Sequence, residues 1–396
     1  MTLIITVAYA VVLISAIFVI LRWGAVRCNG PTPMGIVSLV ALLFTAGLDM
    51  GLIMLPLGEF PVYATEPEFA FSNPLAVEFG MWGPLVWMMY FLSTFYFAIF
   101  EPRLKIFQIP AVKWVYNLTV VATCAFSCYL FYTALPNYIP GIPDWGRWGL
   151  AIFVIAVSVY TSADLHILRW LALTSTWTFV CLIFCALIAG TFFYSGVGLS
   201  ALGSEVVLLS DYFPKITHFL SPINAYHEFY LFWWFSWSIM IGQFVSNFIG
   251  NLRTWTLAIA MIILPSIPLA AWFCVLHVYY TYNILIPAWL NWFMVLVGIV
   301  FVVNSLDALI RLYSRNLGLS VERLGRPRYY AMNFGVQLAL VLAYQFTPFK
   351  IEWVGLMVIG IYAVIYAILL RNPQHIRAAL ATARGEDTQN TEALRA

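Results

Sequence analysis

Two groups of aromatic residues, far apart in the chain, have the spacing of a helix face. Six of their side chains are the candidate ligand-binding residues of this sequence: Trp82, Trp87, Tyr90, Trp233, Trp234 and Trp237. Trp87 is five residues after Trp82, and Tyr90 is three residues after Trp87, so the three side chains are predicted to lie on roughly one face of a helix. Ring faces attract cations, and aromatic cages hold quaternary ammonium groups in this way. Interface belts and ordinary helix packing are the alternatives, but a belt does not account for rings in mid-span.

A carboxylate in the middle of an apolar run is the second feature that could do chemistry. Asp49 stands between Gly47 and Gly51, and a charge at this depth is a candidate functional group. Two flanking glycines predict a broken helix whose freed backbone groups meet a ligand or an ion. A protonated acid bonded to a neighbouring helix is the alternative. Glu59 is expected at the outer end of the same span, as a gate or a structural residue, and Asp307 near a helix end, as a structural one.

Hydroxyl and amide groups within apolar runs form a third candidate set. Thr123 and Ser127 are four residues apart on one face, and Asn304 and Ser305 are adjacent. Oxygen ligands of this kind suit a hard cation such as sodium. The alternative is that these groups bond to backbone carbonyls or pack between helices.

Composition decides the class of protein. The chain has 396 residues, of which 63% are hydrophobic and only 9% charged. Soluble domains carry about 25% charged residues, so this sequence predicts an all-α integral membrane protein that crosses the bilayer many times. The formal net charge of +2 gives no indication of nucleic acid as a partner.

The cysteines and histidines offer weaker chemistry. Two cysteine pairs have i,i+4 spacing, Cys124 with Cys128 and Cys181 with Cys185, and packing between helices is favoured over a metal site. The five histidines are scattered, which disfavours a haem bound by two histidines without removing that alternative. We therefore expect no metal centre, no cofactor and no enzymatic activity.

Apolar runs of about 20 residues predict the membrane spans. Eleven are expected: 2–22, 34–57, 80–100, 112–135, 146–165, 170–195, 225–249, 254–281, 286–312, 328–347 and 351–371. With the N-terminus outside and the C-terminus in the cytoplasm, all but three of the 19 Lys and Arg residues fall on the inner side. The connection 196–224 is expected to be an amphipathic surface helix or a plain loop. The tail 372–396 is expected to be a short helix followed by a disordered segment.

These motifs together resemble the betaine/carnitine/choline transporter family. The stretch 229–242 is similar to the aromatic signature of that family, and the first aromatic group to its Trp-Gly region. Gly47–Gly51 followed by Glu59 resembles the glycine-rich stretch that ends in Glu-Pro, and Asn304–Asp307 resembles the Thr-Ser-x-Asp-Ser segment. Pro265 and Trp272 match a proline and a tryptophan in the helix that follows the signature. The matches keep their order along the chain.

The resemblance implies a LeuT-type core of two inverted five-helix repeats. Residues 34–195 would form the first repeat and 225–371 the second, with 1–33 as one extra helix and inner loop, 196–224 as the outer connection and 372–396 as a cytoplasmic tail. It also implies a multi-pass protein of the bacterial inner membrane, and many members of the family are homotrimers.

Four residues depart from the family pattern, and they bear on the binding site and the coupling ion. Asp49 stands where the family has the middle glycine, which favours a cationic substrate or a bound proton. Asn304 and Met240 replace a threonine and a phenylalanine, which puts the usual sodium sites in doubt, and Leu231 replaces a signature tryptophan.

The expected function is secondary active transport of a quaternary ammonium solute such as choline, betaine or a carnitine-like compound, coupled to sodium or to a proton. Two alternatives stay open. One is a transporter-derived sensor or complex subunit without transport activity, and the other is a haem-bearing membrane subunit.

Overall fold

The computed structural model describes residues 1–48, 50–194, 196 and 198–384, and helices make up nearly all of this part of the chain. The helices run in this order: α1 (Thr2–Trp23), α2 (Ile36–Gly47), α3 (Gly51–Met54), α4 (Pro56–Thr65), α5 (Pro74–Trp82), α6 (Pro84–Ile99), α7 (Glu101–Leu104), α8 (Pro110–Tyr138), α9 (Asp144–Ser162), α10 (Leu165–Ile188), α11 (Leu199–Ser210), α12 (Tyr212–Lys215), α13 (Ala225–Ser246), α14 (Thr254–Ala258), α15 (Leu264–Thr281), α16 (Ala288–Asn316), α17 (Val321–Leu324), α18 (Arg326–Phe346), α19 (Ile351–Arg371) and α20 (Pro373–Arg384). Two short strands, β1 (Arg27–Cys28) and β2 (Leu252–Arg253), pair antiparallel.

Many of these helices are long and apolar enough to cross a membrane, so the chain is a multi-pass membrane protein. Within the described residues seven segments qualify: Thr2–Trp23, Pro74–Ile99, Pro110–Tyr138, Leu165–Phe193, Thr254–Thr281, Ala288–Asn316 and Ile351–Arg371. The other four predicted spans are also helical. However, α2 has only 12 residues, and α9, α13 and α18 are not among the seven. The total of eleven spans therefore stays a prediction.

The predicted span 34–57 is interrupted in the structure. Helix α2 ends at Gly47, Leu48 is extended with φ −122° and ψ 143°, and a helix resumes at Gly51. This is the broken helix that the two glycines predicted. Asp49 itself lies outside the described residues.

The predicted span 80–100 begins earlier than expected. Its helix starts at Pro74, where the Asn73 side chain accepts a hydrogen bond from the backbone N–H of Ala76. A capping asparagine followed by proline is a strong start signal. The predicted start at residue 80 was wrong because Glu78 lowers the local hydropathy. Glu78 in fact lies inside helix α5.

The connection 196–224, for which the sequence left two alternatives, and the beginning of the tail both contain helices. Within 196–224, α11 packs against α5 and α15, and its Glu205 side chain is buried. The alternative of a plain loop is therefore wrong. Helix α11 packs directly on α5 and α15. In the tail, α20 forms the expected short helix, and residues 385–396 lie outside the described part.

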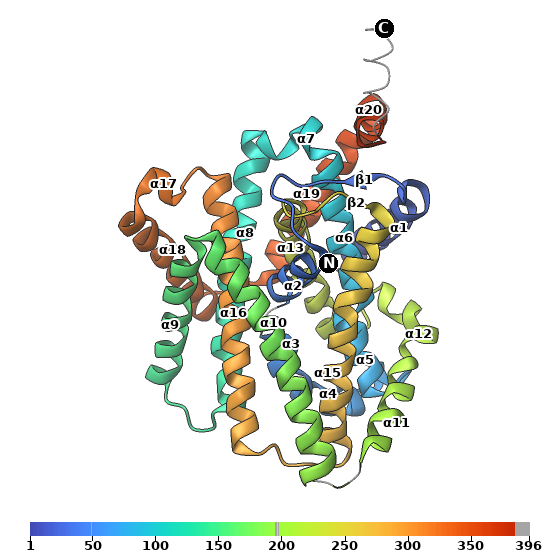
Figure 1. The fold of residues 1–396 in the computed structure, drawn as a ribbon, viewed down its shortest axis with the longest axis vertical. Coiled ribbons are helices and arrows are strands. Elements are labelled where there is room, and N and C mark those ends of the chain that lie inside the picture. The colour runs from blue at the N-terminus through green and yellow to red at the C-terminus, as the bar shows by residue number, and fades with distance from the viewer. Residues whose placement is uncertain (49, 195, 197, 385–396) are drawn as a thin grey trace.

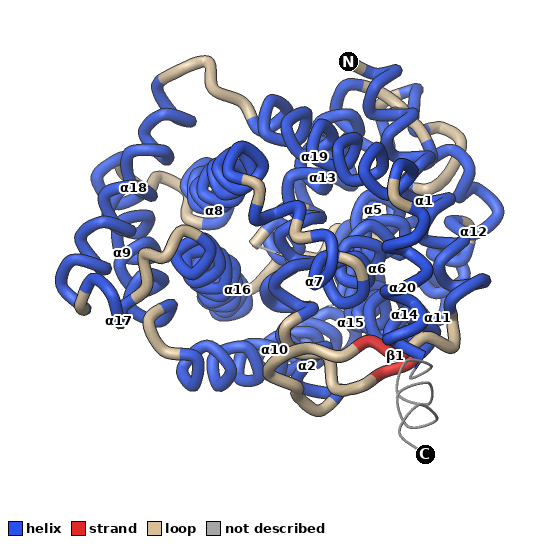
Figure 2. Tube along the Cα trace, turned by 90° about the horizontal axis from the view of Figure 1, so that it is seen from above, coloured by secondary structure: helices blue, strands red, loops and turns tan. Residues whose placement is uncertain are grey.

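The long helices form two groups that lie side by side (Figures 1 and 2). Helices α8, α9, α16 and α18 pack on one another on one side of the molecule, and α6 packs on α1 and α13 on the other. Between the groups, α10 contacts α2 and α16, while α19 contacts α13 and α8. The aromatic groups lie on α5, α6 and α13, and the interrupted helix begins with α2, which contacts both α13 and α16.

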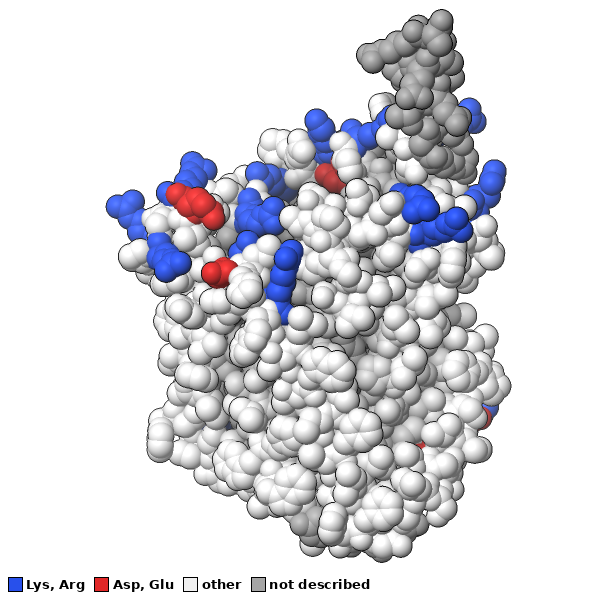
Figure 3. All heavy atoms as spheres, in the orientation of Figure 1, with Lys and Arg blue, Asp and Glu red and all other residues white. Residues whose placement is uncertain are grey.

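Lys and Arg side chains gather at one end of the face shown in Figure 3. In the same orientation this end carries α7, α17 and α20 (Figure 1), and we call it the basic end. Helices α4, α5 and α11 lie in the half away from it (Figure 1). A one-sided distribution of this kind is what the positive-inside rule requires of a multi-pass protein.

Helices α13 and α19 approach closely at Gly355. A Cβ atom at this position would lie 2.5 Å from the carbonyl oxygen of Phe232 and 3.0 Å from its Cα. Because those are backbone atoms, they cannot move aside without shifting a helix. The glycine therefore sets the separation of the two helices.

Gly355→Ala is expected to destabilise the protein by about 1–3 kcal/mol through overpacking. The measurement is the thermal unfolding midpoint of purified protein, which should fall. Gly360→Ala on the same helix is the matched control, since a Cβ there meets nothing within 4 Å. Equal midpoints for the two variants would contradict the close packing of α13 and α19.

Candidate functional site

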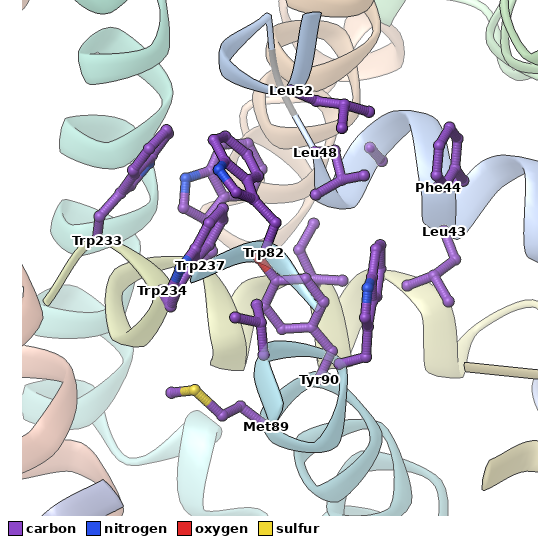
Figure 4. Packing of buried hydrophobic residues seen from close by; sticks show 14 of the residues in the cluster. Leu43, Phe44, Leu48, Leu52, Trp82, Met89, Tyr90, Trp233, Trp234 and Trp237 are labelled. Carbon is purple, nitrogen blue, oxygen red and sulfur yellow. The ribbon is translucent and has the colours of Figure 1, made fainter. Parts of the chain in front are cut away.

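The two aromatic groups of the sequence meet in the structure. Trp82, at the end of α5, lies edge-on to Trp233 and Trp234 of α13, with ring centroids 5.6 and 4.9 Å apart. Trp233 and Trp234 are stacked at 4.8 Å, and Tyr230 is 5.7 Å from Trp82. Figure 4 shows these tryptophans in one group with Trp237, and Tyr90 beside them. All of these rings are buried.

Trp87 and Tyr90 form a second group next to the helix interruption. Their rings are perpendicular at 5.5 Å, and Phe44 of α2 stacks on Trp87 at 6.5 Å. The Tyr90 hydroxyl donates to the Gly47 carbonyl oxygen at 3.1 Å, and a Cβ on Gly47 would lie 3.2 Å from the Tyr90 ring. This group holds the last turn of α2 in place.

The expectation that Trp82, Trp87 and Tyr90 share one helix face is wrong. The helix ends at Trp82, Gly83 is extended with φ −84° and ψ −150°, and α6 begins at Pro84. A proline disfavours a continuous helix, because its nitrogen has no hydrogen to donate and its ring crowds the preceding turn. Trp82 is thereby turned toward α13, whereas Trp87 and Tyr90 face α2.

The rings fill one another's space in this conformation. A cavity of about 330 Å³ lies instead between the ends of α13 and α16, lined by Asn247, Arg311 and Arg315 among others, and one of about 250 Å³ lies between α1, α6 and α19. Neither is lined by any of the six candidate rings. The cluster is closed, so a ligand reaches the ring faces only when the rings or their helices separate.

The indole nitrogens of the cluster are largely unpaired. Trp234 donates to the Met81 carbonyl oxygen at 2.9 Å. The buried indole N–H groups of Trp82, Trp87, Trp233 and Trp237 have no hydrogen-bond partner among the described residues. Unpaired buried donors are costly and rare in folded proteins, so the cluster stays a candidate site.

Side chains from neighbouring helices bond to free carbonyl groups at the helix interruption and in the short helix α3 that follows it. Ser305 of α16 donates to the Leu48 carbonyl at 3.0 Å. The Trp272 indole donates to Leu52 at 2.9 Å, and the Tyr138 hydroxyl to Met54 at 2.6 Å. Backbone groups freed within a membrane must be satisfied in this way.

The four residues predicted to bind a coupling ion occupy different places. Ser305 contacts the helix interruption, while the Thr123 hydroxyl bonds to the Thr119 carbonyl in its own helix at 2.9 Å. Asn304 donates to Ser175 at 2.6 Å, and the buried Ser127 hydroxyl has no partner among the described residues. Their role in binding sodium stays a prediction.

Two buried carboxyl groups lie beside the aromatic cluster, and the sequence analysis missed one of them. Glu59 of α4 and Glu78 of α5 are 5% and 0% exposed, and their carboxyl groups face each other. Tyr226 and Tyr230 of α13 both donate to Glu59 Oε1, the latter at 2.5 Å. Glu59 Oε2 and both Glu78 oxygens have no hydrogen-bond partner among the described residues. Glu78 is four residues before Trp82, a spacing that places both on one face of α5 and could have found it.

A second buried pair of titratable groups lies between α11 and α15. His277 Nδ1 of α15 is 2.5 Å from Glu205 Oε2 of α11, and the Phe60 ring lies edge-on to the imidazole at 5.0 Å. His277 Nε2 has no partner among the described residues. Phe60 thus places this pair against α4, the helix that also carries Glu59.

Asp307, for which a structural role is expected, is fully buried in α16. The side chain is 0% exposed, and neither carboxyl oxygen has a hydrogen-bond partner among the described residues. Arg311, four residues later, donates instead to the Ser162 carbonyl at 3.1 Å. Among the described contacts, Asp307 and Arg311 therefore do not form an ion pair within the helix.

Comparison with known proteins gives little to set beside this site. No protein-family model and no curated protein sequence matches the chain. A solved structure of a Na⁺-coupled sialic acid symporter, in a substrate-bound outward-open state, has a TM-score of 0.47 and 14% sequence identity, over 96% of this chain and 85% of that chain. At this degree of likeness, the fold and function of this chain have to be argued from its own residues.

Removing the hydrogen bonds that hold the helix interruption is expected to loosen it. Ser305→Ala and Tyr90→Phe each take a donor from a carbonyl group of this segment, at a cost of about 1 kcal/mol. Hydrogen-exchange mass spectrometry should show faster exchange in peptides covering residues 43–55. Ser236→Ala is the control, because that hydroxyl bonds only to its own helix at Trp233. Exchange as slow as in the unaltered protein would show that other contacts hold the segment.

Proposed function

We propose that this protein is a secondary active transporter of a small quaternary ammonium or related cationic solute, working by alternating access. One observation carries the proposal: buried aromatic rings with unpaired indole groups adjoin two buried carboxyl groups and an interrupted helix inside a membrane protein. Ring faces and carboxylates both attract a cation that has given up its water shell.

The pattern of helix contacts supports two inverted repeats. Each predicted span of 34–195 can be matched, in chain order, with a predicted span of 225–371. When the matched spans are exchanged, a pair of helices in contact corresponds to another pair in contact. The α2–α10 contact corresponds to α13–α19, and α6–α13 corresponds to α15–α2. Likewise α8–α19 corresponds to α16–α10, and α8–α18 to α16–α9. A LeuT-type core has this symmetry, and in such cores one helix group rocks against the other around a central site.

The acidic groups favour a cation over a zwitterion. Betaine and carnitine carry their own carboxylate, which would be repelled if either Glu59 or Glu78 is ionised beside the rings. Choline carries only the positive charge. Of the three solutes, choline is therefore the expected best ligand. The basic end would face the cytoplasm, in accord with the positive-inside rule.

A second candidate function is favoured by the closed packing of the rings. A transporter-derived sensor or complex subunit would retain the fold and the aromatic core without an opening site. The two functions differ in one measurable property, since only the transporter binds and moves the solute.

Replacing a ring that touches the ligand is expected to weaken choline binding. Trp82→Leu and Trp237→Leu should each raise the dissociation constant for tritiated choline roughly 10-fold, as expected for a lost cation–π contact. Equilibrium binding to purified protein, with and without sodium, is the measurement. Trp82→Phe should lie between Trp82→Leu and the unaltered protein because it keeps a ring.

Trp177→Leu is the matched control, since Trp177 lies on α10 and is 67% exposed. Each variant should first be shown to be monodisperse, because Trp82→Leu also leaves a cavity. If the unaltered protein binds no choline, betaine or carnitine, the transporter proposal fails and the sensor or subunit takes its place.

A further inference from the structure

We propose that Glu59 and Glu78 hold one proton between them and that a cationic substrate displaces this proton, so that the protein exchanges a proton for the cation. The first half stands on the geometry of the two carboxyl groups. The second half rests on the proposed function.

Burial and lack of partners require the proton. Glu78 is 0% exposed, and neither of its oxygens is hydrogen-bonded to a described residue. Glu59 stands opposite it on α4, and in the described part of the chain neither carboxyl makes an ion pair. Two unpaired carboxylates facing each other in a medium of low dielectric repel strongly, and each also loses its hydration. One of them must therefore be neutral, as in other carboxyl pairs that share a proton.

The hydrogen bonds decide which carboxyl carries the proton. Glu59 Oε1 accepts from the hydroxyls of Tyr226 and Tyr230, and donors of this kind stabilise an ionised carboxylate. Glu78 has no such donors in normal geometry, although Tyr63 and the Trp82 indole lie nearby. The proton accordingly belongs on Glu78, with Glu59 Oε2 free to accept it.

Titratable groups around the pair come from several of the helices packed on it. Tyr63 lies on α4, Tyr226 and Tyr230 on α13, and Tyr138 of α8 is near enough to feel the Glu59 charge. On α15 the His277–Glu205 pair stands behind Phe60. The tyrosines are neutral donors at physiological pH. The negative charge of the pair is thus not neutralised by these tyrosines.

Tyr230 connects the pair with the aromatic cluster. Its hydroxyl donates to Glu59, and its ring contacts Trp82, Trp233 and Trp234 at 5.7, 5.4 and 6.1 Å. A cation held among these rings therefore lies beside the two carboxyl groups. Once the cation is bound, both carboxylates can be ionised, and the Glu78 proton leaves to water as the site opens. For a monovalent cation, one proton leaves for each cation that binds, and the charge of the site is conserved.

The proton itself can be tested without a substrate. Infrared spectra of the purified full-length protein at neutral pH should contain a protonated carboxyl band that Glu78→Gln removes. Glu59→Gln should keep the band, because a lone buried Glu78 remains protonated. Glu101→Gln is the matched control: its carboxylate is partly buried, but it accepts from Tyr96 and from the backbone N–H groups of Ile106 and Phe107. An unchanged spectrum in Glu78→Gln would overturn the inference.

The exchange is tested by adding choline chloride to weakly buffered protein that contains a pH indicator dye. The expected result is release of about one proton per choline bound, as charge balance requires, and no release from Glu78→Gln. Choline binding without proton release would overturn the exchange. Proton release by sodium chloride instead would identify the pair as a sodium site. If no choline binds while the infrared band depends on Glu78, the proposed substrate is wrong and the proton site stands.

Discussion

The absence of water in a membrane interior constrains every part of this structure. A polar group buried there must form a hydrogen bond or an ion pair, be electrically neutral, or bind a ligand. Most groups in this protein find partners. The carbonyl groups freed at the break between Gly47 and Gly51 accept from Tyr90 and Ser305, and that of Leu52, just after the break, accepts from Trp272. Some buried polar groups, however, have no hydrogen-bond partner among the described residues.

One group of these unpaired atoms lies where α4, α5 and α13 meet. Glu78, Trp82 and Trp233 all have buried polar atoms without partners there, within one packed cluster. A bound cation would interact favourably with the carboxylates and with the ring faces at the same time. Because the rings now fill one another's space, binding must be coupled to movement of the helices that carry them. Such coupling is what alternating access requires, and it links the closed packing to the proposed transport.

Part of this site could be predicted from the sequence. Residue type and spacing singled out Trp82, Trp233 and Trp234, which contact one another, and the glycines at 47 and 51 predicted the broken helix. The rest depended on contacts between distant segments, which spacing along one helix does not reveal. Pro84 marks the break that turns Trp82 away from Trp87 and could have been used. Glu78 was missed because it reduces the hydropathy that defines a span, so the most informative carboxylate was placed outside the helix.

The central claim is that the aromatic and acidic site serves to move a small cation across the membrane. Uptake of labelled choline into liposomes that contain the purified protein, with the lumen made more acidic than the outside, tests it most directly. The account predicts accumulation above that of protein-free liposomes, and its collapse when the pH difference is dissipated. Uptake equal to that of protein-free liposomes, for choline and for betaine, would contradict it.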